Sequence, residues 1–578
     1  MQLKHASFGK CVLYASLPIV FIALSLSSVQ QKSPTYDETV HLFAGYSYLK
    51  WGDYRVNPEH PPLIKMLAAA PLLAVDLNTS RITPGERHIV QEDKNYGWIL
   101  AHRFVFVDND AETLFFYARC IMIALALPIA WFIWLWARDL YGIEAAGVAV
   151  ALFCFDPNII AHAPIVQTDV PFALLFFAST YFFWRTLNQM TWLNLTMTAT
   201  LFGLAAITKF SFVVILPIWA MLGLTKVITG SPLLSPITSP ATILSRWKKV
   251  LFISVILILA IVSAYIAIWT VYQFRYDSTP VQRGPFPLAG FTGDDSWFAY
   301  LVEQCREKFL FPEALIYGVA DAFSRIERDG YLLGELSADG FWLFFPVAFL
   351  TKTPTVILLL IAIATMQMAS NGRPQRSVLF LLLPAIIFFS FAVGSRLNLG
   401  LRHILPIYPF LLVWTGGAVA TIWKSGFRGA KLCLGFLAIW LVGSTLWAYP
   451  NYLAYFNELA GGPANGHKIL VDSNLDWGQD LKALKKWMER SGVQEIQLAY
   501  FGTADPAYYK INALHLPGSV YRSNPPHTGL TKAPPYVAIS ATFLQGLYLD
   551  DPDRYALFRK REPIVNIGHS ISVYNVNE

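Results

Sequence analysis

A segment rich in carboxylates, imidazoles and aromatic rings follows the first apolar run of the chain. It spans residues 36–63, YDETVHLFAGYSYLKWGDYRVNPEHPPL, and its acidic and histidine residues are Asp37, Glu38, His41, Asp53, Glu59 and His60. Carboxylates this close to hydrocarbon are costly unless they are hydrated, paired or used in function. A carboxylate in such a place can take a proton from a reacting hydroxyl group. We therefore interpret this segment as the active-site loop of a membrane enzyme.

Two acidic sites are the candidates for proton transfer. Asp37 and Glu38 form an adjacent pair, and Asp169 lies in the connection HAPIVQTDVPF between two apolar runs. Both sites have a structural alternative. Asp37 is placed to cap a helix, and Asp169 can do the same because Pro171 is expected just inside the next helix. Capping does not exclude catalysis at Asp37. Acids beside helix starts on one membrane face can converge on a single cavity, so we expect a catalytic role for all three.

Isolated cationic residues recur at the expected outer ends of apolar runs. They are Arg119, Lys209, Lys352, Arg402 and the adjacent His403. Any one of them is explained by a side chain that reaches up to the lipid headgroups, and this is the main alternative for Arg119. Several together oppose the usual bias of positive charge toward the cytoplasm. They predict a shared anionic ligand, for which a lipid-linked phosphate is the natural candidate.

Three residues near Asp37 also allow a divalent metal site. His41, Glu59 and His60 carry metal-ligating groups, but their spacing matches no closed ligand set. We expect them to support the loop through hydrogen bonds. A metal site is the alternative.

Composition places the chain in the membrane. Of its 578 residues, 55% are hydrophobic and 14% are charged, whereas soluble domains carry about 25% charged residues. The net charge of +6 is spread in short clusters between apolar runs, a pattern typical of membrane topology and not of nucleic-acid binding. The five cysteines show no CxxC spacing, so neither a disulfide framework nor a cysteine metal site is predicted.

The apolar runs predict a polytopic α-helical protein with about eleven transmembrane helices. Runs of spanning length lie near residues 11–29, 115–137, 143–164, 167–185, 192–208, 210–228, 250–274, 344–369, 377–394, 403–423 and 430–448. The first run follows Lys4 and Lys10, as in a signal peptide, but no small-residue cleavage site stands out after it. Tight spacing and three prolines allow spans within 143–228 to merge or break.

A cytoplasmic N-terminus puts most Lys and Arg residues of the short connections inside, as the positive-inside rule requires. Three large regions then lie outside: residues 30–114, residues 275–343 and the tail after residue 449. Residues 39–51 and 62–75 are expected to be amphipathic helices lying in the membrane interface. Residues 1–449 are thus the transmembrane domain, and residues 450–578 are an extracytoplasmic domain.

The tail is polar and contains the strand-like runs KILVD, EIQLAYF, YVAISAT and ISVYNV around a helix near residues 480–490. This pattern predicts a small α/β domain. Its motif DSNLDWGQDL brings together Asp472, Asp476 and Asp480. These acids could form a polar site, but we favour a strand-end turn that leads into a helix with an acidic first turn.

An ordered set of motifs resembles the C-type (GT-C) glycosyltransferases. The set is the Asp-Glu pair after the first span, then NPEHPP, QTD, TKTP, RHILP, NELAGGP and DSNLDWGQDLKALKKW. The resemblance covers the whole chain and is closest to bacterial members of the group that includes protein O-mannosyltransferases and the aminoarabinose transferase of lipid A. It implies a bacterial plasma-membrane enzyme, a hexosyl- or pentosyltransferase with a polyprenyl-phosphate-linked sugar as donor.

The resemblance also implies roles for individual residues. Asp37 matches the acid that acts on the acceptor hydroxyl, Glu38 is its neighbour, and Asp169 is the second loop acid. Donor-phosphate contacts fall on Lys209, Lys352, Arg402 and His403. The acceptor, a lipid, a glycan or a protein, stands on the outer face. Residues 275–343 lack the MIR repeats of the mannosyltransferases, which weakens the expectation of a protein acceptor.

The chemistry suits these residues independently of the resemblance. Phosphate leaves a sugar's anomeric carbon as a stable anion and needs cations to hold its charge. One carboxylate must take the acceptor's proton, a contribution of about 10² to 10⁴ in rate, and a single displacement inverts the configuration. The alternative is a transporter or flippase with outer acids as coupling sites, but that class favours charges deep in the spans and two matching halves, which the sequence does not show. A polymerase or ligase of the same superfamily would differ only in the acceptor.

Overall fold

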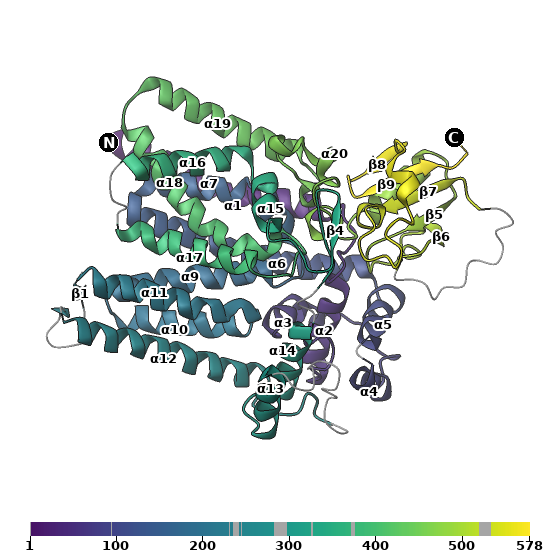
Figure 1. Ribbon diagram of the computed structural model, residues 1–578, viewed down its shortest axis with the longest axis horizontal. Helices are drawn as coiled ribbons and strands as arrows, with labels where there is room; N and C mark the ends of the chain where they lie inside the picture. The colour runs from purple at the N-terminus through teal and green to yellow at the C-terminus, as the bar shows by residue number, and fades with distance from the viewer. Residues whose placement is uncertain are drawn as a thin grey trace.

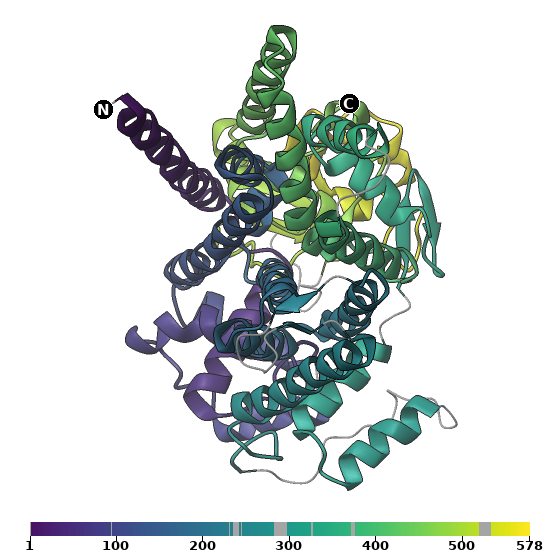
Figure 2. The ribbon, with the colours of Figure 1, turned by 90° about the vertical axis from the view of Figure 1, so that its left-hand side faces the viewer.

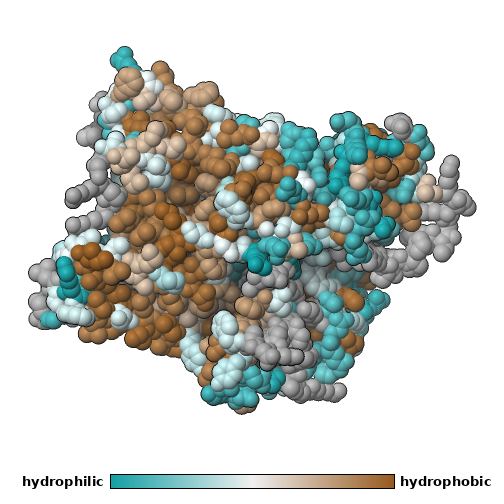
Figure 3. All heavy atoms as spheres, in the orientation of Figure 1, coloured by the Kyte–Doolittle hydropathy of each residue, from teal (hydrophilic) through white to brown (hydrophobic). Residues whose placement is uncertain are grey.

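The computed structural model describes residues 2–93, 95–230, 232–234, 242–243, 245–281, 297–324, 328–370, 376–519 and 533–577. A bundle of long helices fills one end of the molecule, and a small domain with a β-sheet stands at the other (Figure 1). Apolar residues cover the visible face of the bundle, while polar residues gather over the domain (Figure 3). The chain is a polytopic membrane protein whose polar domain stands at one end of an apolar helix bundle.

The bundle contains the apolar runs of the sequence. Its helices are α1 (Gln2–Val29), α6 (Ala111–Tyr141), α7 (Ile143–Cys154), α8 (Pro157–His162), α9 (Asp169–Asn188), α10 (Trp192–Ala206), η3 (Phe210–Val214), α11 (Ile215–Ile228), α12 (Arg246–Val271), α15 (Phe344–Lys352), α16 (Thr355–Ser370), α17 (Arg376–Val393), η4 (Leu401–Ile407), α18 (Tyr408–Lys424) and α19 (Arg428–Trp447). Seen toward the bundle, α1 lies at the periphery with its N-terminal end projecting outward (Figure 2).

Length and composition test the expected spans. Within the described residues, six helices are long and apolar enough to cross a membrane, or up to seven if the bent pair of α15 and α16 is one span. The helices that qualify singly are α6, α9, η3 with α11, α12, η4 with α18, and α19. The other four expected spans are helical but shorter: Ser16–Val29, Ile143–Cys154, Trp192–Ala206 and Ser377–Val393. The total of eleven crossings remains a prediction.

Two expected spans contain a break in the helix. Residues 143–164 divide into α7 and α8, and residues 344–369 divide into α15 and α16, a bent pair that can still form one span. In the first, Asp156 accepts from the backbone N–H of Asn158 at 2.8 Å and starts a new helix at Pro157. In the second, α15 and α16 meet at 107° across Thr353 and Pro354. Proline has no backbone N–H and cannot continue the preceding helix, so the chain turns sharply next to Lys352.

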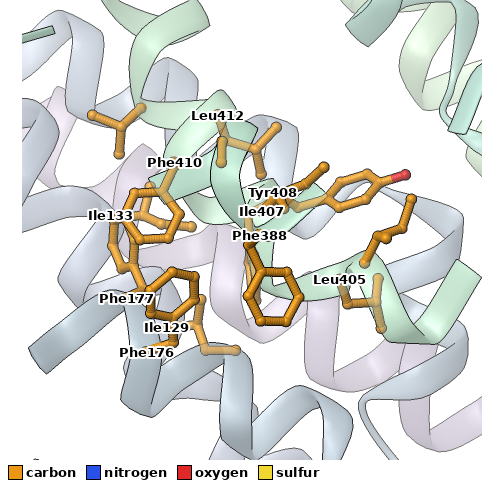
Figure 4. Packing of buried hydrophobic residues seen from close by; sticks show 14 of the residues in the cluster. Ile129, Ile133, Phe176, Phe177, Phe388, Leu405, Ile407, Tyr408, Phe410 and Leu412 are labelled. Carbon is orange, nitrogen blue, oxygen red and sulfur yellow. The ribbon is translucent and has the colours of Figure 1, made fainter. Parts of the chain in front are cut away.

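Aromatic packing holds the centre of the bundle together. Phe410 of α18 lies 5.1 Å from Phe176 and 4.9 Å from Phe177, both on α9, measured between ring centroids. Phe388 of α17 contacts Phe176 at 5.4 Å, and Figure 4 shows these rings together. Because lipid tails are as apolar as the side chains, such close packing holds helices together in a membrane. It fixes the start of α9 beside η4, where two of the predicted site residues lie.

The first outer region folds against the bundle. It contains α2 (Glu38–Trp51), α3 (Leu63–Ala69), η1 (Ala70–Ala74), α4 (Pro84–Glu92), α5 (Tyr96–His102) and the π-helical turn η2 (Arg103–Val107). The predicted interfacial position of residues 39–51 is wrong, because every residue of α2 from Glu38 to Tyr48 is buried in protein. A Cβ at Gly45 would stand 1.9 Å from the carbonyl oxygen of Lys65, so glycine permits α2 and α3 to touch.

The second outer region covers the first. It contains α13 (Trp297–Glu307), α14 (Glu313–Ser324) and the antiparallel pair β3 (Gly330–Leu332) and β4 (Glu335–Ser337). A Cβ at Gly318 of α14 would stand 1.9 Å from the carbonyl oxygen of Pro58. The helix therefore presses on the NPEHPP turn and fixes its course. A further short pair, β1 (Leu233–Leu234) and β2 (Thr242–Ile243), lies between α11 and α12.

The tail folds around a five-stranded sheet of order β6-β5-β7-β9-β8. Its elements are η5 (Tyr452–Ala454), η6 (Glu458–Ala460), α20 (Pro463–Gly466), η7 (Asp472–Asn474), α21 (Leu481–Arg490), β5 (Glu495–Ala499), β6 (Asn512–His515), β7 (Tyr536–Ser540), α22 (Ala541–Leu544), α23 (Ala556–Arg559), β8 (Val565–Ile567) and β9 (Ile571–Asn575). β5 pairs in parallel with β6 and β7, while β9 runs antiparallel to β7 and β8. Three predicted strands and the helix agree with this structure.

The predicted strand KILVD is wrong, and β6 and β8 have no counterpart among the predicted strands. The backbone N–H groups of Ile469 and Leu470 both donate to the carbonyl of Gly466, so the chain turns here. Asp472 then takes a left-handed backbone conformation with φ of 56°, which ends any extended run.

Candidate active site

A cavity of about 940 Å³ lies between the bundle and the tail domain. Its volume is at the upper end of the range of about 300–1,000 Å³ seen for small-molecule sites. Its lining is Tyr36, Asp37, Glu59, His60, Asn95, Trp98, Ala322, Arg328, Asp329, Ala338, Asp339, Leu397, Leu399, Arg402, His403, Asp472, Trp477, Phe501, Gly518, Phe543 and Tyr548. All three outer regions contribute to it, together with η4.

Asp37 lies on the wall of this cavity at the start of α2. It occupies the N-cap position, yet its side chain makes no capping hydrogen bond. Its side chain is 21% exposed, and its Oδ2 lies 3.5 Å from Nη1 of Arg402. The structure thus leaves the Asp37 carboxylate turned to the cavity and not to the helix backbone.

Glu38 has different surroundings from its neighbour, because its side chain is completely buried. Arg119 donates to both of its oxygens, at 3.0 and 2.7 Å, and the backbone N–H groups of Thr35 and Val166 donate as well. The Arg119 guanidinium also donates to the carbonyls of Val29, Lys32 and Ser33. Neither residue is on the cavity wall. The pair ties the end of α1 to the loop that carries Asp37.

Asp169 is the first residue of α9 and is only 1% exposed. The N-cap residue of α9 is Thr168, and its side chain makes no capping hydrogen bond. Oδ1 of Asp169 accepts from Lys209, and Oδ2 of Asp169 lies 3.5 Å from Nη1 of Arg402. Asp37, Arg402, Asp169 and Lys209 therefore form one chain of alternating charge that leads from the cavity into the protein.

Arg402 is the centre of that chain. Its guanidinium lies 4.3 Å from the ring of Trp477, and its Nε lies 3.3 Å from the hydroxyl of Ser473. Since a cation over an indole face is attracted to the ring electrons, the tail domain fixes the position of this side chain. His403 lines the cavity beside it.

Lys352 lies apart from the other predicted cations. Its ammonium group donates to the carbonyls of Leu453 and Asn474 and lies 4.7 Å from the ring of Phe456. It is 1% exposed and does not line the cavity. Because it stands where α15 meets α16, it fastens the sharp bend of the bundle to the tail segment.

The three residues expected to support the loop lie together. His41 Nδ1 is 2.9 Å from the carbonyl oxygen of Val166, and His41 Nε2 is 3.9 Å from Oε1 of Glu59. The rings of His41 and His60 are 6.3 Å apart. Burial lowers the pKa of His60 to about 3, so His60 is uncharged at neutral pH. In the part of the chain that the structure describes, no group of three His, Cys, Asp or Glu side chains is arranged to hold a metal ion.

The tail motif DSNLDWGQDL contributes more to the cavity than expected. Asp472 and Trp477 line it, and Asp472 accepts a hydrogen bond of 2.7 Å from the hydroxyl of Tyr548. Asp476 and Asp480 do not line the cavity. The predicted strand-end turn and acidic first helical turn are wrong, because the described residues directly before this motif form no strand and α21 begins at Leu481 without an acid in its first turn. Asp476 accepts from the backbone N–H of Thr542, and Asp480 pairs with Lys32 at 2.6 Å.

Fold and site together define a membrane protein with a large polar and aromatic cavity at one end of its helix bundle. Residues 97–269 match the family described as dolichyl-phosphate-mannose-protein mannosyltransferase. The segment includes Arg119, Asp169 and Lys209, and it confirms the resemblance to C-type glycosyltransferases over these residues.

Three solved structures are similar at 12% identity. The Saccharomyces cerevisiae protein O-mannosyltransferase Pmt1-Pmt2 complex bound to the sugar donor has a TM-score of 0.48, with 77% of this chain and 89% of that chain covered. ArnT from Cupriavidus metallidurans bound to undecaprenyl phosphate has a TM-score of 0.47, with 98% and 97% covered. The Archaeoglobus fulgidus oligosaccharyltransferase in the apo form has a TM-score of 0.46, with 93% and 71% covered. Comparison with curated proteins gives no match.

Proposed function

We propose that the protein is a membrane glycosyltransferase that moves a sugar from a polyprenyl-phosphate carrier to an acceptor hydroxyl, with Asp37 as the base. The observation that carries this proposal is the position of Asp37. Among the three acids expected to be catalytic, Asp37 is the one whose carboxylate lines the cavity, while Glu38 and Asp169 are buried against cations. The family match of residues 97–269 supports the reaction class.

The reaction is a single displacement at the anomeric carbon. The acceptor oxygen forms a bond to that carbon as the carbon–oxygen bond to the phosphate breaks, and the electron pair of the broken bond leaves with the phosphate. Asp37 takes the proton of the acceptor hydroxyl, a role worth about 10² to 10⁴ in rate. Attack from the face opposite the phosphate inverts the configuration of the sugar.

The phosphate needs positive charge on the other side of the sugar. In this proposal Arg402 and His403 meet the phosphate at the cavity wall. Lys209 acts from behind them, because it pairs with Asp169 and leaves Arg402 less neutralised. Lys352 and Arg119 position the surrounding segments.

The charge pattern supports an outward-facing site. The helices α6, α9, α11 and α18 all begin near the site, and each ends in a last turn that carries a basic residue. Those residues are Arg138, Arg185, Lys226 and Lys424. Because positive charge marks the cytoplasmic ends of spans, the cavity belongs to the extracytoplasmic face, which in a bacterium is the outer side of the plasma membrane.

The test compares purified wild type with Asp37→Asn and a matched control. Asp76→Asn changes an exposed acid of the same outer region. Each protein is mixed with a radiolabelled polyprenyl-phosphate sugar and a membrane extract as acceptor, and the label that leaves the donor is counted. We expect transfer by wild type and Asp76→Asn, and a loss of about 10² to 10⁴ in Asp37→Asn. If wild type releases no label while a known transferase does so with the same materials, the transporter alternative is favoured.

A further inference from the structure

The tail domain turns the carboxyl ends of its parallel strands toward the cavity. Phe501 follows the end of β5, Gly518 follows the end of β6, and Phe543 follows the end of β7. All three residues line the cavity. In open α/β sheets, ligands bind outside the carboxyl ends of parallel strands. The carboxyl ends of these strands, where α/β sheets usually bind ligands, therefore face the cavity.

Aromatic rings gather at these strand ends. The ring centroid of Phe501 is 5.2 Å from that of Tyr36, 5.6 Å from that of Phe543 and 5.7 Å from that of Tyr548. We call the surface formed by Asp472, Trp477, Phe501, Phe543 and Tyr548 the aromatic wall. Aromatic rings attract C–H groups through their negative faces, and a sugar ring presents several C–H groups together with its hydroxyls.

The aromatic wall also carries a carboxylate that can accept hydrogen bonds. Asp472 accepts from the hydroxyl of Tyr548 at 2.7 Å. A carboxylate has about four lone-pair sites, so Asp472 keeps capacity for hydroxyl donors from the cavity. A few placed polar groups among aromatic side chains are the usual make-up of a small-molecule site.

The position of the wall distinguishes between kinds of acceptor. An extended peptide is commonly held by backbone hydrogen bonds to a free edge strand. The edge strands of this sheet are β6 and β8, whereas the cavity is lined from the strand ends by side chains and turns. This geometry suits a compact ring with several hydroxyls better than an extended chain.

We propose that the aromatic wall is an acceptor subsite that binds a sugar ring, so that the acceptor is a carbohydrate or glycolipid whose hydroxyl is directed toward Asp37. This inference rests on the proposed function and names its acceptor class. A cavity of about 940 Å³ leaves room for a donor sugar beside an acceptor ring.

The first test identifies what the transferred sugar is attached to. Wild type is incubated with the labelled donor and a membrane extract, and the product is cleaved by partial acid hydrolysis and subjected to linkage analysis. A labelled disaccharide supports the proposal. Label on serine, threonine or any other group that is not a sugar overturns it. Failure to cleave the donor even to water overturns the proposed function itself, and this result is recognised by the absence of free labelled sugar.

The second test measures the ratio of transfer to hydrolysis of the donor by water. Phe501→Ala should lower this ratio about tenfold, as loss of a well-packed aromatic contact does in binding sites. Tyr548→Phe keeps the ring but removes the hydroxyl that meets Asp472, and it should lower the ratio several-fold. The control is Tyr536→Ala, because Tyr536 begins β7 at the amino end of the strand, away from the cavity.

An unchanged ratio in both Phe501→Ala and Tyr548→Phe, or an equal fall in the Tyr536→Ala control, would overturn the proposal. If Phe501→Ala elutes as an aggregate, Tyr548→Phe alone decides, because it leaves the packing of the ring in place.

Discussion

Nη1 of Arg402 lies 3.5 Å from Oδ2 of Asp37 and equally 3.5 Å from Oδ2 of Asp169. One guanidinium group thus faces an acid on the cavity wall and an acid in the interior. Its two partners differ in exposure, since the side chain of Asp37 is 21% exposed and that of Asp169 is 2% exposed. The cation can turn toward a ligand in the cavity while Asp169 and Trp477 hold its place.

Replacement of Arg402 is expected to impair use of the donor. Arg402→Ala removes the cation nearest Asp37 and should lower kcat/KM for the donor by about 10² or more, the effect of losing one stabiliser of developing charge. Arg402→Lys keeps the charge but lacks the planar fork, and should retain part of the activity. The control is Arg138→Ala, which removes a cation from the last turn of α6, far from the cavity lining. Equal losses in Arg402→Ala and Arg138→Ala would contradict a role of Arg402 in binding the donor.

Loss of the buried Glu38 charge is expected to affect stability more than chemistry. Glu38→Gln leaves Arg119 buried without its anion, and breaking such a pair costs about 3–5 kcal/mol. The purified variant should unfold at a lower temperature than wild type in detergent, whereas Asp37→Asn should not. A Glu38→Gln protein with wild-type stability and no transfer would instead make Glu38 a catalytic residue.

The pair of Lys32 and Asp480 is expected to hold the tail domain against the bundle. Lys32 donates to Asp480 at 2.6 Å, and the Asp480 side chain is fully buried. Lys32→Met leaves this carboxylate without its cation and should increase protease cleavage between the bundle and the tail. The matched control is Lys485→Met, which removes a lysine paired with an exposed glutamate. Equal cleavage of the two variants would argue against a fastening role.

The stability of the tail domain is expected to depend on pH through Asp476. Burial, with a smaller effect of nearby Asp480, raises the pKa of Asp476 from 3.8 to about 7. Between these values the folded protein binds more protons than the unfolded chain, so this group's contribution to stability is present at low pH and is lost as pH rises toward 7. Asp476→Asn should flatten this dependence. The measurement is the Tm of both proteins at pH 5 and pH 7.5, and parallel slopes would contradict the prediction.

The residue types along the sequence predicted the helices of the bundle and several residues that lie together in the site. Apolar runs gave the helices of the bundle, and isolated charges at their ends identified Asp37, Asp169, Lys209 and Arg402, which the structure brings together. A charge beside hydrocarbon is rarely without a partner, so its presence in the sequence is informative. Nothing in the order of residues shows which partner it has.

The remaining features depend on contacts distant in the sequence. Residues 39–51 are buried because α3, η1, α5 and η2 pack against α2, an arrangement that the sequence pattern of α2 alone does not reveal. Lys352 resembles the other lone cations in sequence but is covered by the tail segment. Phe501, Phe543 and Tyr548 read as ordinary strand-end and turn residues. Only the direction in which the sheet faces the bundle makes them part of the cavity.

The cavity lining combines Tyr36 and Asp37 with tail residues that lie more than 400 positions later in the sequence, and this sets an order of assembly. Asp37 emerges early in synthesis, whereas Phe501, Phe543 and Tyr548 emerge near its end. A nascent chain of 449 residues contains Asp37 and Arg402 but lacks every residue of the aromatic wall. The cavity therefore becomes complete only after the tail domain has folded against the bundle.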